Sequence, residues 1–184
     1  LMTQTSVRTC AQICAFAAAA LLAGSAAAVT KDEYRATTDR ISAEYKAAKA
    51  KCNALSGQPK DLCVAEANAA QKRAKARAAA DYENTAKARE NAVIADAEAT
   101  YMVAKEQCAT KTGNDKDVCV KAAKAAETKA KADAKAARQT TVAKADAKDT
   151  KREADYKVAR EKCDPLTGAA KDKCVADAKA KYGQ

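Results

Sequence analysis

Three twelve-residue stretches bounded by cysteines organise this sequence: CNALSGQPKDLC at 52–63, CATKTGNDKDVC at 108–119 and CDPLTGAAKDKC at 163–174. In each stretch a Ser or Thr precedes a glycine, and a Lys-Asp pair follows two residues later. The three glycines are Gly57, Gly113 and Gly168. Glycine tolerates the left-handed backbone that ends many helices, and the helix dipole favours an aspartate in the first turn of the next. Each stretch therefore predicts a helix, a tight turn at the glycine and a second helix.

The cysteines of each stretch lie about a turn and a half from the predicted bend, on facing helices. At this position an antiparallel pair of helices brings two Cβ atoms within disulfide range. Six cysteines allow fifteen pairings. Zinc ligation, a redox-active pair and disulfides between chains are alternatives, but the chain has no His and no C-x-x-C motif. Hairpin geometry favours three local disulfides: Cys52–Cys63, Cys108–Cys119 and Cys163–Cys174.

The repeat extends beyond the cysteines. A tyrosine precedes the first cysteine of each stretch by seven residues, and a valine follows the second, with a period of 55 to 56 residues. The full cassettes span 45–64, 101–120 and 156–175. Such repetition indicates duplication. We interpret Tyr45, Tyr101 and Tyr156 as packing residues with their hydroxyl groups at the wet edge, in preference to ligand-binding residues.

The composition predicts an all-α fold of elongated antiparallel hairpins or coiled coil, made of three disulfide-stapled helix-turn-helix repeats. Alanine supplies 42 of residues 29–184, and alanine is the best helix former. So few large apolar side chains cannot form a thick core. Pro165 should end its helix early, near Cys163. We expect four helices, at about 31–56, 59–112, 115–166 and 170–182.

The two long predicted helices should form an antiparallel pair, with the first and third cassettes at one end and the second at the other. The short outer helices should pack at the first end, leaving a bare two-helix stalk beyond them. In the alternative arrangement, the long helices break near their middles, around YENTAK at 82–87, and three separate hairpins stack.

The N-terminal residues have the layout of a secretory signal peptide. Arg8 precedes an apolar stretch, and the small residues SAAA end it at 25–28. We expect a signal peptide at 1–28, a single helical repeat region at 29–184, and a periplasmic or secreted protein. Cys10 and Cys14 are interpreted as ordinary signal-peptide residues. Export to an oxidising compartment agrees with the predicted disulfides.

The Ala/Lys-rich stretch KAAKAAETKAKADAKAA at 121–137 resembles the helical middle region of TolA-type cell-envelope proteins. The cassette form YKAAKAKC…SG…KDLCVAEA is similar to small exported proteins of Gram-negative bacteria that carry TolA-like names. The resemblance covers nearly all of residues 29–184. The cleavable N-terminal segment departs from the retained membrane anchor of TolA, so an energy-transducing role is not implied.

Function is less defined than fold. With no His, no nucleophile elbow and no Gly-rich phosphate loop, we expect no enzyme, no cofactor, no metal site and no small-molecule substrate. The leading hypothesis is a structural or interaction protein of the cell envelope, a stapled helical rod with an envelope protein as its partner. An exposed alanine stripe would also allow pairing with a second copy of the chain. A chaperone would need an apolar cradle that these residues do not provide.

The second hypothesis is binding to a polyanion such as an envelope polymer, anionic lipid or nucleic acid. Residues 29–184 contain 33 basic and 24 acidic residues, a net charge of +9. The competing interpretation of this charge is a solubilising surface. The candidate contact residues are Lys121, Lys124, Lys129, Lys131 and Lys135.

Overall fold

The computed structural model describes residues 28–184, and in this range the predicted all-α fold is confirmed. The predicted signal peptide, with Cys10 and Cys14, lies outside the described residues except for its last position. The helices are α1 (Lys31–Cys52), α2 (Gly57–Glu83), α3 (Ala86–Cys108), α4 (Gly113–Glu161) and α5 (Gly168–Tyr182).

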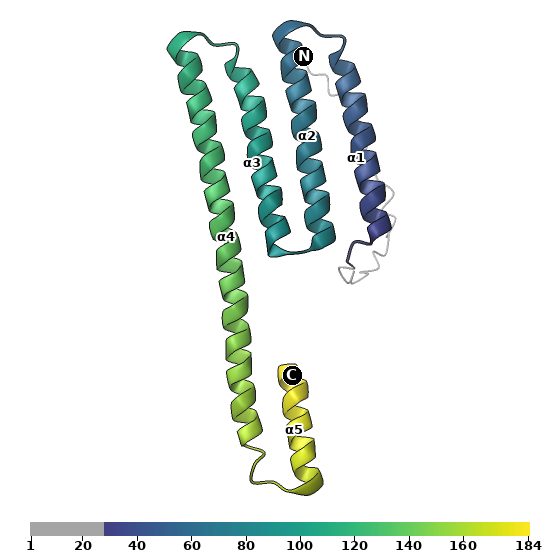
Figure 1. Ribbon diagram of the computed structural model, residues 1–184, viewed down its shortest axis with the longest axis vertical. Coiled ribbons are helices and arrows are strands. Elements are labelled where there is room, and N and C mark those ends of the chain that lie inside the picture. The colour runs from purple at the N-terminus through teal and green to yellow at the C-terminus, as the bar shows by residue number, and fades with distance from the viewer. Residues whose placement is uncertain (1–27) are drawn as a thin grey trace, which may run out of the picture.

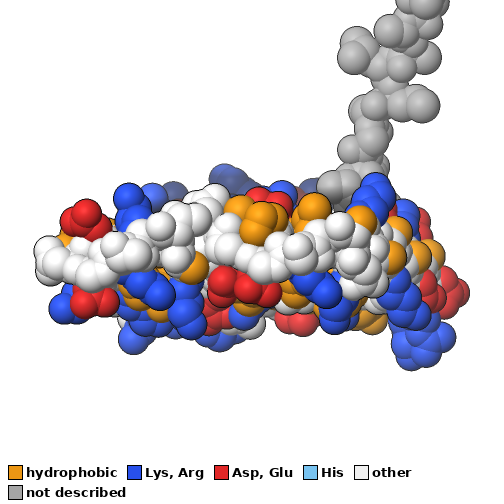
Figure 2. Space-filling view, turned by 90° about the horizontal axis from the view of Figure 1, so that it is seen from above, with side chains coloured by type: hydrophobic (Ala, Val, Ile, Leu, Met, Phe, Trp, Pro, Cys, Tyr) orange, Lys and Arg blue, Asp and Glu red, His pale blue; other side chains and the backbone are white. Residues whose placement is uncertain are grey.

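The helices form a single layer in the order of the chain. Among the described residues, each helix contacts only the helix before it and the helix after it. The helices α1, α2, α3 and the first half of α4 lie side by side, and the rest of α4 extends beyond them to pair with α5 (Figure 1). Viewed from the end that carries the first two turns, the layer shows basic, acidic and apolar side chains intermixed (Figure 2). Both broad faces of the layer are therefore open to solvent.

The two middle helices bury alanines on opposite sides. In α2 the buried residues include Ala65, Ala67 and Ala69, and α3 likewise buries Ala95, Ala97 and Ala99. Because an α-helix turns by about 100° per residue, side chains two positions apart point in nearly opposite directions. Alternate alanines therefore form two stripes, one against each neighbouring helix. The polar residues between them lie on the two broad faces of the layer.

The core consists of thin seams between helices. Among the described residues, the buried apolar side chains are eleven alanines, three cysteines and Ile41. Small side chains let the helix backbones approach closely, but each contributes little buried apolar area. The seams alone therefore stabilise each pair of helices weakly.

The three predicted disulfides are present, with Cα atoms 5.6 to 5.7 Å apart. The three glycines have left-handed backbones, with φ between +53° and +59°. Their predicted place at the end of the first helix is wrong, because each begins the following helix. The first helices end four or five residues earlier than predicted, at Cys52, Cys108 and Glu161. Tight i to i−3 backbone bonds follow these ends, such as Leu55 N to Cys52 O, and α4 ends before Pro165 as predicted.

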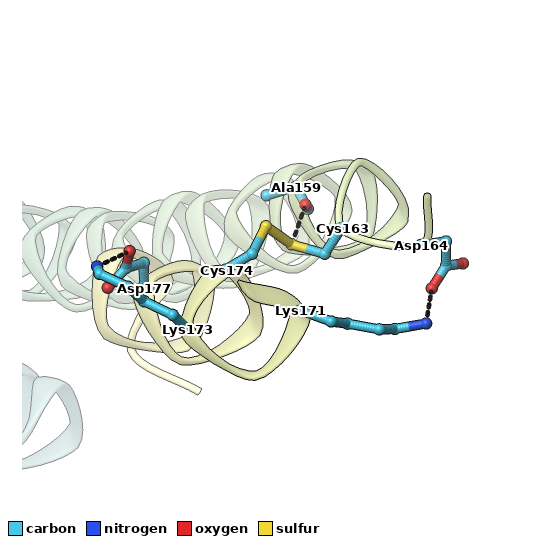
Figure 3. Close-up of a disulfide and its surroundings, with 7 residues drawn as sticks. All are labelled: Ala159, Cys163, Asp164, Lys171, Lys173, Cys174 and Asp177. Carbon is cyan, nitrogen blue, oxygen red and sulfur yellow. Dashed lines mark hydrogen bonds and ion pairs between the residues drawn. A yellow bond between two sulfur atoms is a disulfide. The ribbon is translucent and has the colours of Figure 1, made fainter. Parts of the chain in front are cut away.

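The third turn also has an ion pair next to its disulfide. Lys171 Nζ lies 3.1 Å from Asp164 Oδ1, across the turn from the Cys163–Cys174 bond (Figure 3). The carbonyl oxygen of Ala159 is 3.5 Å from Cys163 Sγ. A disulfide sulfur carries no hydrogen, so this is a packing contact. The turn is thus closed by one covalent bond and one exposed ion pair.

The prediction of one helix over 59–112 is wrong, because the chain reverses between α2 and α3. Asn84 adopts a left-handed backbone, with φ 47°, and Thr85 caps α3 by accepting a hydrogen bond from Ala88 N at 3.0 Å. Asn tolerates this backbone better than most residues, and Thr is a good N-cap. The break within 82–87 had been the alternative prediction.

The reversal also corrects the predicted placement of the cassettes. With α3 antiparallel to α2, the first and second turns lie at one end of the layer and the third lies at the opposite end (Figure 1). The first and third had been predicted to lie together. A two-helix extension does exist, formed by the end of α4 and by α5.

The helix α4 continues through the position where the preceding repeat breaks, as predicted for 115–166. Asn84 is 21 residues after Cys63, and Thr140 is 21 residues after Cys119. A β-branched residue is strongly disfavoured in the left-handed conformation, so this position cannot easily reverse the chain. Residues 139–154 are exposed on every side of the helix. This bare segment, about 24 Å long, connects the layer to the α4–α5 hairpin.

We expect the third disulfide to be the one on which local structure depends most. In α5 only Ala178 is buried, whereas α1 has Ile41 in its seam and a stacked Tyr34–Tyr82 pair with ring centroids 4.7 Å apart. A loop of this size contributes about 3 kcal/mol. The double variant C163A/C174A should therefore lose amide hydrogen-exchange protection throughout α5. In the matched control C52A/C63A, α1 should keep partial protection, and wild-type protection of α5 in C163A/C174A would contradict the expectation.

Candidate functional site

The densest cluster of charged side chains crosses three helices on one broad face. Glu98 of α3 contacts Lys72 of α2 and lies 2.7 Å from Lys131 of α4. Lys131 also lies 2.7 Å from Glu127, and Lys124 is 2.7 Å from the same carboxylate. We name this side of the layer the lysine face, after Lys72 and Lys131. The network connects α2, α3 and α4, whose alanine seams are thin.

The charges of this network stabilise one another. Hydrogen bonds from Lys131 and then Lys72 hold the pKa of Glu98 below its ordinary value. Lys124 and Lys131 lower the pKa of Glu127 in the same way. Hydrogen bonds to Glu127 and Glu98 raise the pKa of Lys131. All of these groups are therefore charged at neutral pH.

The opposite side of the layer, which we name the arginine face after Arg73 and Arg77, has a smaller cluster. Arg73 donates hydrogen bonds of 2.8 Å to Asp96 and to Thr100, and Arg77 lies 4.0 Å from Asp96. Asp96 and Glu98 are two residues apart, so they point to opposite faces. The α2–α3 seam is consequently bridged by ion pairs on both faces.

A shallow groove on the arginine face follows the α3–α4 seam. It encloses about 310 Å³ and is lined mainly by small apolar residues, with Val93, Tyr101 and Glu127 among the larger ones. Its polar groups are few. In the described part of the chain, no three His, Cys, Asp or Glu side chains are grouped as metal ligands, and no helix is long and apolar enough to span a membrane.

The five candidate polyanion contacts do not form one patch. Lys124 and Lys131 belong to the ion-pair network and lie against buried or half-buried carboxylates. Lys121, Lys129 and Lys135 are exposed and have no ion pair among residues 28–184. Lys129 lies on a different side of α4 from Lys121 and Lys135, as the helical spacing requires. Only these three remain available to an external anion.

The repeat tyrosines lie half-buried against neighbouring helices. Tyr45 donates a 2.8 Å hydrogen bond to Asn68 of α2, and the ammonium of Lys124 is 4.9 Å from the ring centroid of Tyr101. Both contacts agree with the packing role that we predicted. The sequence analysis missed the Tyr34–Tyr82 stack and the Glu98 bridge. The carboxylates in the Ala-polar alternation of 95–99 were the only available signal for the bridge.

Comparisons with protein-family models, with curated proteins and with solved structures gave no match.

The Glu98 bridge predicts a specific loss of stability in acid. A carboxylate whose folded pKa is lowered stabilises the fold above its unfolded pKa, and this stability is lost as the pH falls through the lower folded value. For Glu the loss begins below about pH 4.3. The variant E98Q should melt roughly 2–4 °C lower than wild type at pH 7, and the difference should vanish near pH 3.

The matched control is Glu66→Gln, since Glu66 is exposed on α2 and has no ion pair in the described range. Its melting temperature should follow that of the wild type at both pH values. Equal destabilisation by both variants at pH 7, measured by circular dichroism, would show that the bridge has no special role.

Proposed function

We propose that this chain is a non-enzymatic structural or interaction protein of the cell envelope, exported to the periplasm or secreted. The three disulfides indicate an oxidising environment. The observation that most supports the proposal is the single layer of helices stapled at three turns, which leaves both broad faces accessible. In this role the protein acts as a stiff element that presents two long faces and a projecting hairpin to an envelope partner.

The physical properties of the layer suit spacing and presentation. Each turn is closed covalently, so its helices keep their relative position even where the seam is made only of alanine. The helix α4 alone has 49 residues and is about 74 Å long. The TolA-like resemblance supports an envelope location on the same terms as in the sequence. A partner that recognises one face would contact either the lysine face or the arginine face.

The test is photocrosslinking in living cells that express the full chain. A photoreactive residue replaces Val93 on the arginine face or Asn91 on the opposite face. We expect a discrete larger adduct from one of the two positions, in the exported fraction, with all six cysteines resistant to alkylation. Cytoplasmic protein with free thiols, or no adduct from either position, would contradict the proposal.

Polyanion binding is the second candidate, and the exposure of Lys121, Lys129 and Lys135 favours it. These lysines are free to release counterions, so affinity for heparin, DNA or anionic vesicles should fall linearly with salt in log–log terms. The triple variant K121Q/K129Q/K135Q should flatten the slope.

The control is K124Q/K131Q, which removes the same kind of charge from residues that pair with Glu127 and Glu98. It should lower the melting temperature more than it alters the salt slope. If wild type binds none of the three polyanions at about physiological ionic strength, the positive charge is a solubilising feature.

A further inference from the structure

The edge of α4 that faces away from α3 is uncovered along almost its whole length. Residues Ala123, Glu127, Ala130 and Ala134 line the α3 side, so residues about half a turn away lie on the outer edge. At both ends of this edge is a valine that is more than half exposed, Val118 at 56% and Val158 at 57%. The outer edge, all of it exposed, comprises Val118, Ala122, Ala125, Ala132, Ala136, Ala143, Ala147, Thr150, Ala154 and Val158.

The same repeat positions are covered elsewhere in this chain, in the seam between α2 and α3. Counted from the cysteines, Ala125 and Ala136 correspond to Ala69 and Ala80 of α2, both buried. In the second half of α4, the outer edge corresponds to the side of α3 that packs on α2. There Ala143 and Ala154 replace the buried Ala88 and Ala99. Thus the first half of α4 carries the α2 side of a known seam, and the second half carries the α3 side.

A straight helix cannot bring its own two halves together. In the α2–α3 pair the chain reverses at Asn84, whereas α4 passes through the equivalent Thr140 without a break. The two complementary halves can therefore meet only between two molecules. We propose that a second copy of this chain covers the outer edge of α4, with the two α4 helices antiparallel and a two-fold axis near residue 140.

The ion pairs of the α2–α3 seam set the register of this pairing. Arg73 lies opposite Asp96 and Lys72 opposite Glu98. Transferred by the repeat period, this register places the exposed Lys135 opposite Asp146 of the second copy. Lys129 and Lys151 then take the places of Arg73 and Asp96. They repel each other, so the dimer is weaker than the internal seam and becomes tighter as salt screens the repulsion.

Sedimentation of the oxidised full chain with matched variants tests the pairing. Ala143 lies on the outer edge, and Ala145, also exposed in the bare segment, points to the other side. A143E should weaken dimerisation about tenfold or more, while A145E should leave it unchanged and both should keep wild-type helicity. Lys151→Asp should strengthen the dimer, because it restores the pair that Arg73 and Asp96 make. A monomer at all concentrations, or equal effects of A143E and A145E, would overturn the inference.

Zero-length carbodiimide crosslinking gives a readout that is independent of the variants. Lys135 and Asp146 are about 16 Å apart along one helix, too far for a direct amide bond within a straight α4. We expect this crosslink only in the dimer band. Its presence in the monomer band would mean that α4 bends at Thr140 and closes the seam within one molecule, which also contradicts the proposal. These outcomes do not depend on the envelope role proposed above.

Discussion

The disulfide across each turn is the constraint on which the rest of this structure depends. Each one fixes two antiparallel helices at their shared end, about two helical turns from the repeat tyrosine. Between the fixed ends the helices contact each other mainly through alanines, which approach closely but bury little apolar area. Ordinary hydrophobic packing could not choose among the many ways of pairing such uniform helices. The local covalent bond makes each cassette a hairpin, so neighbours in the chain become neighbours in space.

A single layer follows from the same shortage of large side chains. A second layer would need an apolar broad face, but the broad faces of α2 and α3 carry polar residues between the alternating alanines. The charged side chains on these faces take on a structural task instead. Glu98 connects three helices on the lysine face, and Asp96 connects two on the arginine face. Because such pairs are partly exposed, they stabilise modestly and act as supports for the seams.

Much of the fold could be predicted from the sequence because its signals are local. The spacing of glycine and cysteine within one cassette was enough to place the turns and to pair Cys52 with Cys63. The break at Asn84 was ranked second because no Gly or Pro marks it. Its cause is an Asn in a left-handed backbone followed by a capping Thr, a weaker signal that many unbroken helices also contain. Comparing Asn84 with Thr140 shows why only one of the two repeat junctions reverses the chain.

The candidate site was less predictable because its contacts are distant in the sequence. Lys131 looked like any other lysine of a basic stretch, yet its partner Glu98 is 33 residues away on another helix. Helical spacing within α4 gives no indication of that pairing. The uncovered edge of α4 likewise becomes visible only when the ends of the α2 and α3 helices are known. The charge count alone therefore overstated the basic surface that is open to a ligand.

The most direct test of this architecture is a distance measured along α4. Spin labels on noncanonical residues at positions 116 and 157, both exposed, can be measured by pulsed electron resonance. Dilution with unlabelled protein restricts the measurement to distances within one chain. A straight helix predicts about 60 Å for these 41 residues. A distance below about 25 Å would mean that α4 folds back at Thr140 onto itself as a neighbouring helix, and would contradict the extended layer.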